Sequence, residues 1–269
     1  MESNTYETLL VEKNGPIAVV TINMPETFNA VTVQLLKDLN QLARDMRTDL
    51  KTHVVIVTGA GKAFSAGVDV TKEGRAHWHS GPQPTELLYQ RHGQDALRGL
   101  ENLDQITIAA VNGAAVGAGA GIAAHCDFRI FSEKGWFSLP ETGLGFMLSL
   151  GCTYGLVGLI GPAWTKRVIM TNERVNAQEA FRIGLADKVV PPDQLMNACM
   201  EMAQQIASKA PMANRVTKKQ VNAATIARMD DLRLIEPELV QGLQGFANEL
   251  PEGLQAMWEK RDPEYPEKW

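Results

Sequence analysis

Residues 106–124 read ITIAAVNGAAVGAGAGIAA, and the interpretation of the whole chain starts from this stretch. Its first six residues form an apolar run as long as a buried strand, and the alanines at its end favour a helix. Gly113, Gly117, Gly119 and Gly121 allow a tight turn between the two. A helix that begins in such a turn presents unpaired N–H groups, which stabilise an anion such as an enolate oxygen. Close packing of the helix on the strand explains the same glycines without any ligand.

Outward from this stretch, short apolar runs alternate with helical patterns, which is typical of an α/β fold. Leucines recur on one face between Thr32 and Met46, so this segment is predicted to be a helix. Residues 71–100 are rich in glycine, proline and histidine, which predicts a mobile loop followed by a helix. The strands that we expect are Ile17–Ile22, Val54–Thr58, Ile106–Val111, Asp127–Phe131 and Trp136–Leu139.

The last third of the chain has a helical pattern. Asn176 with Glu179 three residues later resembles a capping box, and Asp193 is a candidate N-cap for the next helix. A pair of prolines just before Asp193 marks a domain boundary. We therefore expect two regions, residues 1–192 and a helical region 193–269.

The composition excludes several classes of protein. The chain has 269 residues, 45% of them hydrophobic, which is enough for a substantial folded core, and its net charge of −5 argues against a nucleic-acid-binding protein. Cys126, Cys152 and Cys199 lack the spacing of metal ligands and indicate a reducing compartment. The uncharged stretches 105–124 and 142–165 are long enough for membrane spans, but their glycines favour turns. With no signal-peptide pattern, we expect a bacterial-type cytoplasm or an organelle matrix.

Two further segments also place a turn after an apolar run. Phe64–Asp69 contains small residues that let a ligand approach the backbone N–H groups. Leu139–Gly145 contains Glu141, the one acid between residues 135 and 165. A carboxylate in apolar surroundings has a raised pKa and becomes a usable base near neutral pH. An ordinary tight turn and a surface acid are the simpler interpretations of the two segments.

These three segments, in this order, resemble motifs of the crotonase (enoyl-CoA hydratase/isomerase) superfamily. Met24–Ala30, Asn176–Leu185 and Pro251–Arg261 are similar to its early Asn-Ala motif, its late helix and its tail, so the resemblance covers nearly the whole chain. It implies an α/β fold with a crotonase-like spiral core of ββα units and a helical C-terminal region. It also implies a homotrimer or a hexamer, with residues 1–192 as the acyl-CoA-binding and catalytic core and residues 193–269 as the trimerisation region.

The resemblance further implies which residues form the site. Members of the superfamily bind acyl-CoA thioesters and hold an enolate with two backbone N–H groups, which correspond here to Ala66 and Ala118. The backbone around Ala66, Asp69 and Val70 corresponds to the part that holds the adenine of coenzyme A. Glu141 corresponds to a catalytic acid/base. Coenzyme A is expected only as part of the substrate, with no permanently bound cofactor, no metal, no nucleic acid and no membrane as partner.

One departure from the superfamily pattern bears on the reaction. Hydratases use two glutamates, whereas this chain has Gly121 at the first position and Glu141 at the second. A single glutamate at the second position is the pattern of enoyl-CoA isomerases. We therefore expect Glu141 to move a proton from C2 to C4 of a 3-enoyl-CoA while Ala66 and Ala118 hold the dienolate. The turn after Glu141 also differs from the superfamily, which predicts a reshaped acyl pocket.

Other functions stay open at this point. Hydration, retro-aldol cleavage or thioester hydrolysis is compatible with one glutamate if another polar side chain assists. A non-catalytic binding protein of the crotonase fold and a serine protease of the related fold are the alternatives outside this chemistry. The dehalogenase branch is set aside, because its aspartate position holds Ile122. The candidates for an assisting side chain are Asp69, Glu73, His77, His79, Ser149 and Tyr154.

Overall fold

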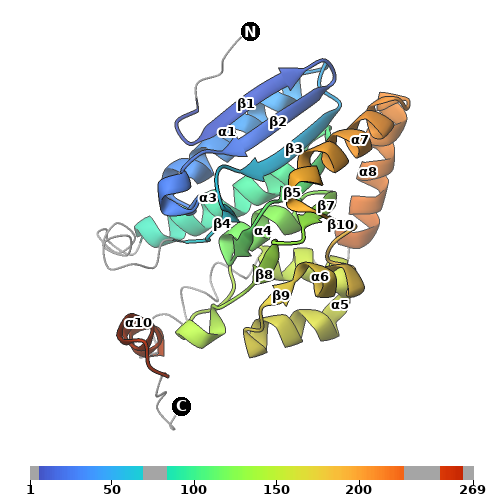
Figure 1. Ribbon diagram of the computed structural model, residues 1–269. Coiled ribbons are helices and arrows are strands. Elements are labelled where there is room, and N and C mark those ends of the chain that lie inside the picture. The colour runs from blue at the N-terminus through green and yellow to red at the C-terminus, as the bar shows by residue number, and fades with distance from the viewer. Residues whose placement is uncertain (1–5, 69–83, 227–248, 263–269) are drawn as a thin grey trace.

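The computed structural model describes residues 6–68, 84–226 and 249–262 (Figure 1). Pairs of strands followed by a helix recur along the first part of the chain, which confirms the predicted α/β fold with a ββα spiral. The repeated elements are β1 (Leu9–Asn14), β2 (Ile17–Ile22) and α1 (Val33–Thr48); β3 (Val54–Gly59), β4 (Ala63–Ser65) and α3 (Pro84–Glu101); β5 (Ile106–Val111), β6 (Ala114–Val116) and α4 (Ala118–Ala124); and β7 (Phe128–Ser132), β8 (Trp136–Ser138) and α5 (Cys152–Thr171).

The strands form two sheets. The first has the order β1-β2-β3-β5-β7-β10 and is parallel except for β1, and the second has the order β4-β6-β8-β9 and is parallel except for β9. Because β4 and β6 are parallel neighbours, the turns that follow them emerge side by side. The remaining elements are β9 (Val175–Asn176), α6 (Ala177–Arg182), β10 (Lys188–Val190), α7 (Leu195–Ala207), α8 (Pro211–Ile226), α10 (Glu249–Glu259), and the 3₁₀ turns η1 (Pro25–Thr27), η2 (Thr142–Leu144) and η3 (Pro192–Gln194).

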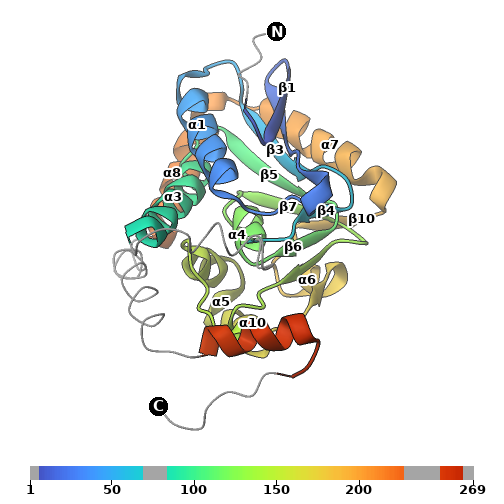
Figure 2. The same ribbon diagram turned by 90° about the vertical axis from the view of Figure 1, so that its left-hand side faces the viewer.

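The first sheet is covered on both faces, as its continuous apolar strands require. All six residues of β3 are buried. Val55 and Val57 belong to the large core that also contains the apolar faces of α1 and α3, whereas Val54 and Ile56 belong to a second core shared with α7. Figure 2 shows α1 and α3 on one side of this sheet and α7 on the other. Alternate side chains of one strand thus supply two cores.

Most local predictions agree with the structure. Thr32 is the N-cap of α1, where its side chain accepts the Leu35 N–H at 3.1 Å, and Asn176 caps α6 by accepting the Glu179 N–H at 2.9 Å. The cap predicted at Asp193 is wrong, because Asp193 lies inside η3 and α7 begins after Gln194 without a side-chain cap. The proline just before Asp193 favours this 3₁₀ turn ahead of the helix.

The predicted boundary at residue 192 falls between β10 and α7. The helix α7 packs directly against the first sheet. It contributes Leu195, Ala198 and Cys199 to a core that it shares with strands of that sheet. The separate role of residues 193–269 as a trimerisation region stays a prediction. Among the described helices, none is both long and apolar enough to cross a bilayer.

Candidate active site

The turns after β4 and β6 lie against each other at Gly67. This residue has a φ of +79°, a conformation that glycine adopts without strain. A Cβ atom on Gly67 would lie 2.5 Å from the Val116 carbonyl oxygen and 3.6 Å from the Ala118 nitrogen. Any side chain at this position would therefore push the two turns apart. Glycine at residue 67 is what allows their close contact.

The turn after β4 is fixed by Asn29, from the predicted Asn-Ala motif. Its Oδ1 accepts the Met24 N–H at 3.0 Å, and its side-chain amide donates to the carbonyls of Ala60 and Ala63 at 2.9 and 2.8 Å. The hydroxyl of Ser65 donates to the Asn29 carbonyl at 2.7 Å. Asn29 and Ser65 are both fully buried, so these bonds hold the turn without competition from water.

The backbone N–H groups of this turn do not have the roles expected from the sequence. The Ala66 N–H, predicted as an oxyanion donor, donates instead to the Phe28 carbonyl at 2.9 Å. The Val68 N–H and the Ala118 N–H have no acceptor among the residues that the structure describes. Gly67 turns the chain between Ala66 and Val68, so sequence position alone does not decide which N–H is available. The available pair is Val68, which the sequence analysis missed, together with Ala118.

Glu141 lies beside the second of these turns. Its Oε1 is 2.6 Å from the position that a Cβ atom of Gly117 would take, and Gly117 directly precedes Ala118. Its Oε2 is buried and has no hydrogen-bond partner in the described part of the chain. Burial raises the pKa of Glu141 to about 7, although a hydrogen bond to its own backbone lowers it somewhat. Glu141 is thus an acid that can gain and lose a proton near neutral pH.

The turn that carries Glu141 is held by Asn172, which the sequence analysis also missed. The Asn172 side-chain amide donates to the carbonyls of Leu139 and Ile169 at 2.8 and 3.0 Å and to the Thr142 hydroxyl at 2.9 Å. Asn172 itself has a φ of +53° at the end of α5. Its 33-residue distance from Leu139 along the chain leaves no local signal for this contact. The helix α10 packs against the same turn.

The position of the absent first glutamate, Gly121, is filled by another residue. A Cβ atom on Gly121 would lie 2.1 Å from the Cys152 Sγ and 3.4 Å from a methyl carbon of Leu97. Cys152 is fully buried at the start of α5. Within the described part of the chain, no neighbouring charged group contributes to the pKa shift of Glu141. A larger side chain at residue 121 has no room unless Cys152 moves.

The other polar candidates do not gather around Glu141 in the described residues. Asp69, Glu73, His77 and His79 lie outside the described residues, as does Val70, which was expected to contact coenzyme A. The Tyr154 hydroxyl is 3.0 Å from the Nε2 of His125. The Ser149 carbonyl accepts the N–H of Cys152 at 3.2 Å, at the start of α5. Among the described residues, no group of three or more His, Cys, Asp or Glu side chains is arranged to hold a metal ion.

A cavity of about 620 Å³ opens beside the first turn, with Ala66 in its lining. Lys62, Lys134 and Trp136 also line it, and the guanidinium of Arg174 lies 3.8 Å above the Trp136 ring. Cationic side chains and an aromatic ring are suited to the phosphates and the base of a nucleotide. No local sequence pattern predicts this group, because its members come from distant strands and turns.

Comparison with known proteins agrees with this geometry. The model of the enoyl-CoA hydratase/isomerase family matches residues 12–268. A short-chain-enoyl-CoA hydratase of Clostridium acetobutylicum is 38% identical over 231 residues, which cover 86% of this chain and 87% of that protein. An enoyl-CoA hydratase of Mycobacterium avium subsp. paratuberculosis has a crystal structure with a TM-score of 0.86 at 25% identity, covering 98% of this chain and 100% of that one.

An isomerase is similar as well. A monofunctional enoyl CoA isomerase from M. smegmatis has a TM-score of 0.68 at 31% identity, covering 81% of this chain and 93% of that one. The names of the relatives refer mostly to hydratases, so they do not confirm the predicted preference for isomerisation. The family model, the relatives and the fold agree on the family, although the names of its members refer to different reactions. The chain therefore belongs to the enoyl-CoA hydratase/isomerase family.

Proposed function

We propose that this enzyme moves the double bond of a 3-enoyl-CoA thioester to the 2 position. The observation that carries the proposal is one carboxylate with a buried oxygen, Glu141, beside two backbone N–H groups, those of Val68 and Ala118, that have no acceptor among the described residues. An isomerisation needs one group that takes up a proton and returns it, and donors that hold the negative charge in between. It needs no second acid and no water.

In the proposed reaction the thioester carbonyl oxygen accepts hydrogen bonds from the Val68 and Ala118 N–H groups. Glu141 removes a proton from C2, and the electron pair of that C–H bond delocalises onto the carbonyl oxygen as a dienolate. Each backbone donor stabilises this oxyanion by about 3 kcal/mol relative to its absence. The protonated Glu141 then delivers the same proton to C4, which leaves the double bond between C2 and C3. The pKa of about 7 suits Glu141 to both steps.

The contact between Gly121 and Cys152 supports one-acid chemistry. Hydration of a 2-enoyl-CoA adds a hydroxyl group at C3 and a proton at C2, so it requires a group that activates water in addition to a proton donor. The space beside Gly121 is taken by the buried Cys152, and no acid among the described residues shifts the pKa of Glu141. A second carboxylate of the described chain is therefore unavailable for water activation.

Hydration is the second candidate function, and the relatives favour it. A protein that is 38% identical is named a short-chain-enoyl-CoA hydratase. For this reaction a group outside the described residues has to hold the water, and Glu73, His77 and His79 lie there. The two candidates share the oxyanion donors and Glu141, and they differ only in whether water takes part.

The cavity beside Ala66 is proposed to hold the nucleotide end of coenzyme A. Lys62, Lys134 and Arg174 supply positive charge for phosphates, and Trp136 offers an aromatic face. The expected contact of the Ala66 backbone with adenine agrees with its place in the lining. The corresponding roles of Asp69 and Val70 and the trimeric or hexameric assembly remain proposals from the resemblance.

A paired assay tests the proposal directly. Purified protein is given a 3-enoyl-CoA and, separately, a 2-enoyl-CoA, and the ultraviolet absorbance of the conjugated thioester is followed. Isomerisation makes absorbance appear with the first substrate, while the second stays nearly unchanged. Loss of absorbance with the second substrate, at a comparable or higher rate, would establish hydration instead. Turnover of neither substrate would contradict both.

The oxyanion donors are tested by Ala118→Pro. Residue 118 is the first residue of α4, a position at which proline is tolerated, and the substitution removes the proposed N–H donor. We expect kcat to fall about 10²–10³-fold. The matched control is Ala177→Pro, which places proline at the first residue of α6. Equal losses of kcat in both variants would mean that proline acts through the fold rather than through the donor.

A further inference from the structure

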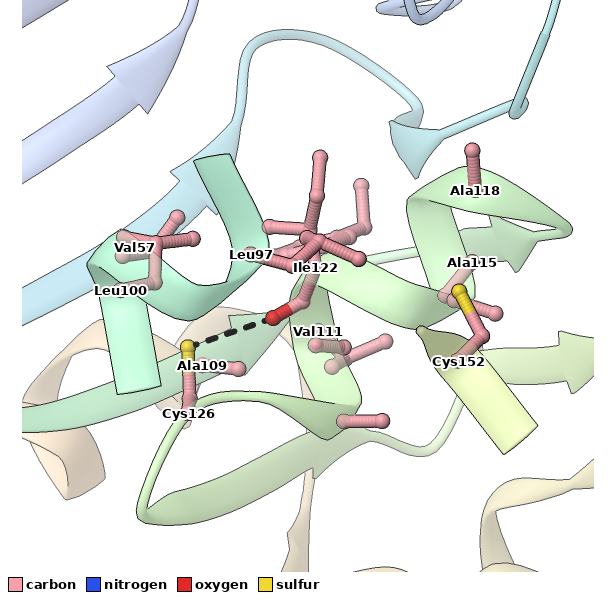
Figure 3. Packing of buried hydrophobic residues seen from close by; sticks show 14 of the residues in the cluster. Val57, Leu97, Leu100, Ala109, Val111, Ala115, Ala118, Ile122, Cys126 and Cys152 are labelled. Carbon is pink, nitrogen blue, oxygen red and sulfur yellow. Dashed lines mark hydrogen bonds between the residues drawn. The ribbon is translucent and has the colours of Figure 1, made fainter. Parts of the chain in front are cut away.

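Two glycines at the interface between α4 and α5 lie against a side chain of the other element, and a third, Gly151, lies against Tyr154 within the start of α5. The Cβ position of Gly121 is 2.1 Å from the Cys152 Sγ, that of Gly151 is 2.8 Å from the Tyr154 hydroxyl oxygen, and that of Gly155 is 3.1 Å from the His125 Cε1. Figure 3 shows Cys152 at the start of α5 with its side chain directed toward α4. Side chains and backbone thus interlock without room for an added methyl group.

Two of these side chains also form a buried hydrogen-bonded chain. The Nδ1 of His125 is 2.8 Å from the Gly121 carbonyl oxygen, and its Nε2 is 3.0 Å from the Tyr154 hydroxyl. The carbonyl can only accept, so Nδ1 of His125 donates to it, and Nε2 is bonded to the Tyr154 hydroxyl. Both rings are 4% exposed and meet edge to face at 5.2 Å. Chains of buried hydrogen bonds of this kind hold a single geometry.

The chain connects the two elements on which the proposed reaction depends. The helix α4 begins at Ala118, whose N–H is a proposed oxyanion donor, and its Gly121 carbonyl is held by His125. The segment α5 begins beside α4, is interrupted by non-helical backbone at Gly161 just before Pro162, and ends at Asn172, which holds the Glu141 turn. Because α5 packs against both α4 and η2, its placement links the position of Glu141 to that of the Ala118 N–H.

We propose that His125 and Tyr154 are positioning residues that set the distance between the oxyanion donors and Glu141. This inference rests on the proposed function of the site, since it concerns the same two groups. Neither side chain has to touch substrate. Reaction rates respond strongly to small displacements of reacting groups, whereas substrate binding through the distant nucleotide cavity does not. The positioning role therefore predicts a loss in kcat with little change in KM.

The test variant is Tyr154→Phe, which keeps the ring and removes only the hydroxyl bonded to His125. Its matched control is Tyr6→Phe, which removes a hydroxyl that donates at 2.7 Å to Asp45, a residue of α1. We expect kcat of Tyr154→Phe to fall about 5- to 10-fold, the effect of one hydrogen bond, with KM within about twofold. Tyr6→Phe is expected to keep kcat at the level of the unaltered protein.

Amide hydrogen exchange of residues 118–124 supplies a readout that does not depend on turnover. We expect faster exchange in Tyr154→Phe and unchanged exchange in Tyr6→Phe. If the unaltered protein turns over neither enoyl-CoA, the proposed function fails, while faster exchange in α4 still supports the link between the helices. If the unaltered protein is active and Tyr154→Phe matches it in both kcat and exchange, the positioning role is overturned. A lowered melting temperature with unchanged kcat also overturns it, because the role would then be structural only.

Discussion

The turn that carries Glu141 and the turn that carries Asp49 shift the pKa of their carboxylates in opposite directions. Asp49, after α1, accepts the N–H groups of Lys51 and Thr52, the Thr52 hydroxyl and the Lys13 ammonium group, all between 2.7 and 3.0 Å. Burial alone would raise the pKa of Asp49, but these donors together lower it well below its usual value. Glu141 has a buried oxygen without a partner among the residues described by the structure, and its pKa is raised to about 7.

The difference distinguishes an acid that stays ionised and holds its turn together from an acid that can exchange a proton near neutral pH. The donors around Asp49 stabilise its charged form, so it stays ionised and holds its turn together. Glu141 is left with the cost of desolvation, so its charged and neutral forms are close in free energy at neutral pH. A proton can then move in either direction without a large penalty. The following predictions test whether missing partners are what make Glu141 reactive.

The largest expected effect is on turnover in Glu141→Gln. The amide keeps the shape of the side chain but cannot take up a proton, so we expect kcat to fall by about 10²–10⁴-fold. Asp49→Asn is the matched control and should leave kcat unchanged. Turnover of Glu141→Gln at the level of the unaltered protein would assign the proton transfer to another group.

The next effect concerns Asp127, a third acid, which has a buried cationic partner. The Lys218 Nζ is 2.7 Å from Asp127 Oδ2, and the side chains are 4% and 18% exposed. Lys218→Met leaves Asp127 without this partner, and we expect the free energy of unfolding to fall by about 3–5 kcal/mol, measured by urea denaturation.

The adjacent Lys219 provides the control for this measurement. It pairs with Asp104 at 2.6 Å but is 65% exposed, so Lys219→Met should cost less than about 1 kcal/mol. Equal losses of stability in the two variants would mean that burial does not determine what a partner contributes to an acid.

A smaller effect is expected in Asp49→Asn. The substitution removes the charge that four donors stabilise, and hydrogen bonds to a charged group contribute about 1.5–3 kcal/mol. Part of this is retained, because the amide oxygen still accepts, so we expect the free energy of unfolding at pH 7 to fall by about 1–2 kcal/mol. Because the pKa of folded Asp49 is lowered, this contribution is present above pH 3.8 and is lost as the pH falls below it. If Asp49→Asn lost the same free energy of unfolding at pH 7 and at pH 2, the charge of Asp49 would not be what stabilises the fold.

Glu141 is expected to give the opposite pH dependence. Folding raises its pKa from 4.5 to about 7, so the folded protein binds the extra proton between these values, and stability falls as the pH rises through them. Glu141→Gln lacks this loss. The melting temperature of the variant minus that of the unaltered protein should therefore rise between pH 4.5 and pH 7. In the same experiment kcat/KM of the unaltered protein should rise through a pKa near 7, as the free carboxylate forms. A pH-independent difference in melting temperature would show that Glu141 is not desolvated.

Local patterns were enough to predict part of the site. The segment of Ala118 was predicted because an apolar strand, a glycine turn and a helix follow one another within residues 106–124, while the choice of Ala118 itself came from the resemblance to the superfamily. Glu141 was found because it is the one acid in a long uncharged stretch. Both signals are contained in neighbouring residues. Val68 was missed because Ala66, two residues earlier, looks equally suitable until the acceptor at Phe28 is known.

The sequence by itself determined the alternation of strands and helices, the turns after them and the one acid within its apolar stretch, because hydrophobic periodicity and glycine act over a few residues. The tertiary structure alone decided which N–H groups are free, that Cys152 fills the space beside Gly121, and that Asn172 holds the Glu141 turn. Each of these depends on residues brought together from about 30 or more positions apart. Such contacts exist only after the two sheets and their helices have packed.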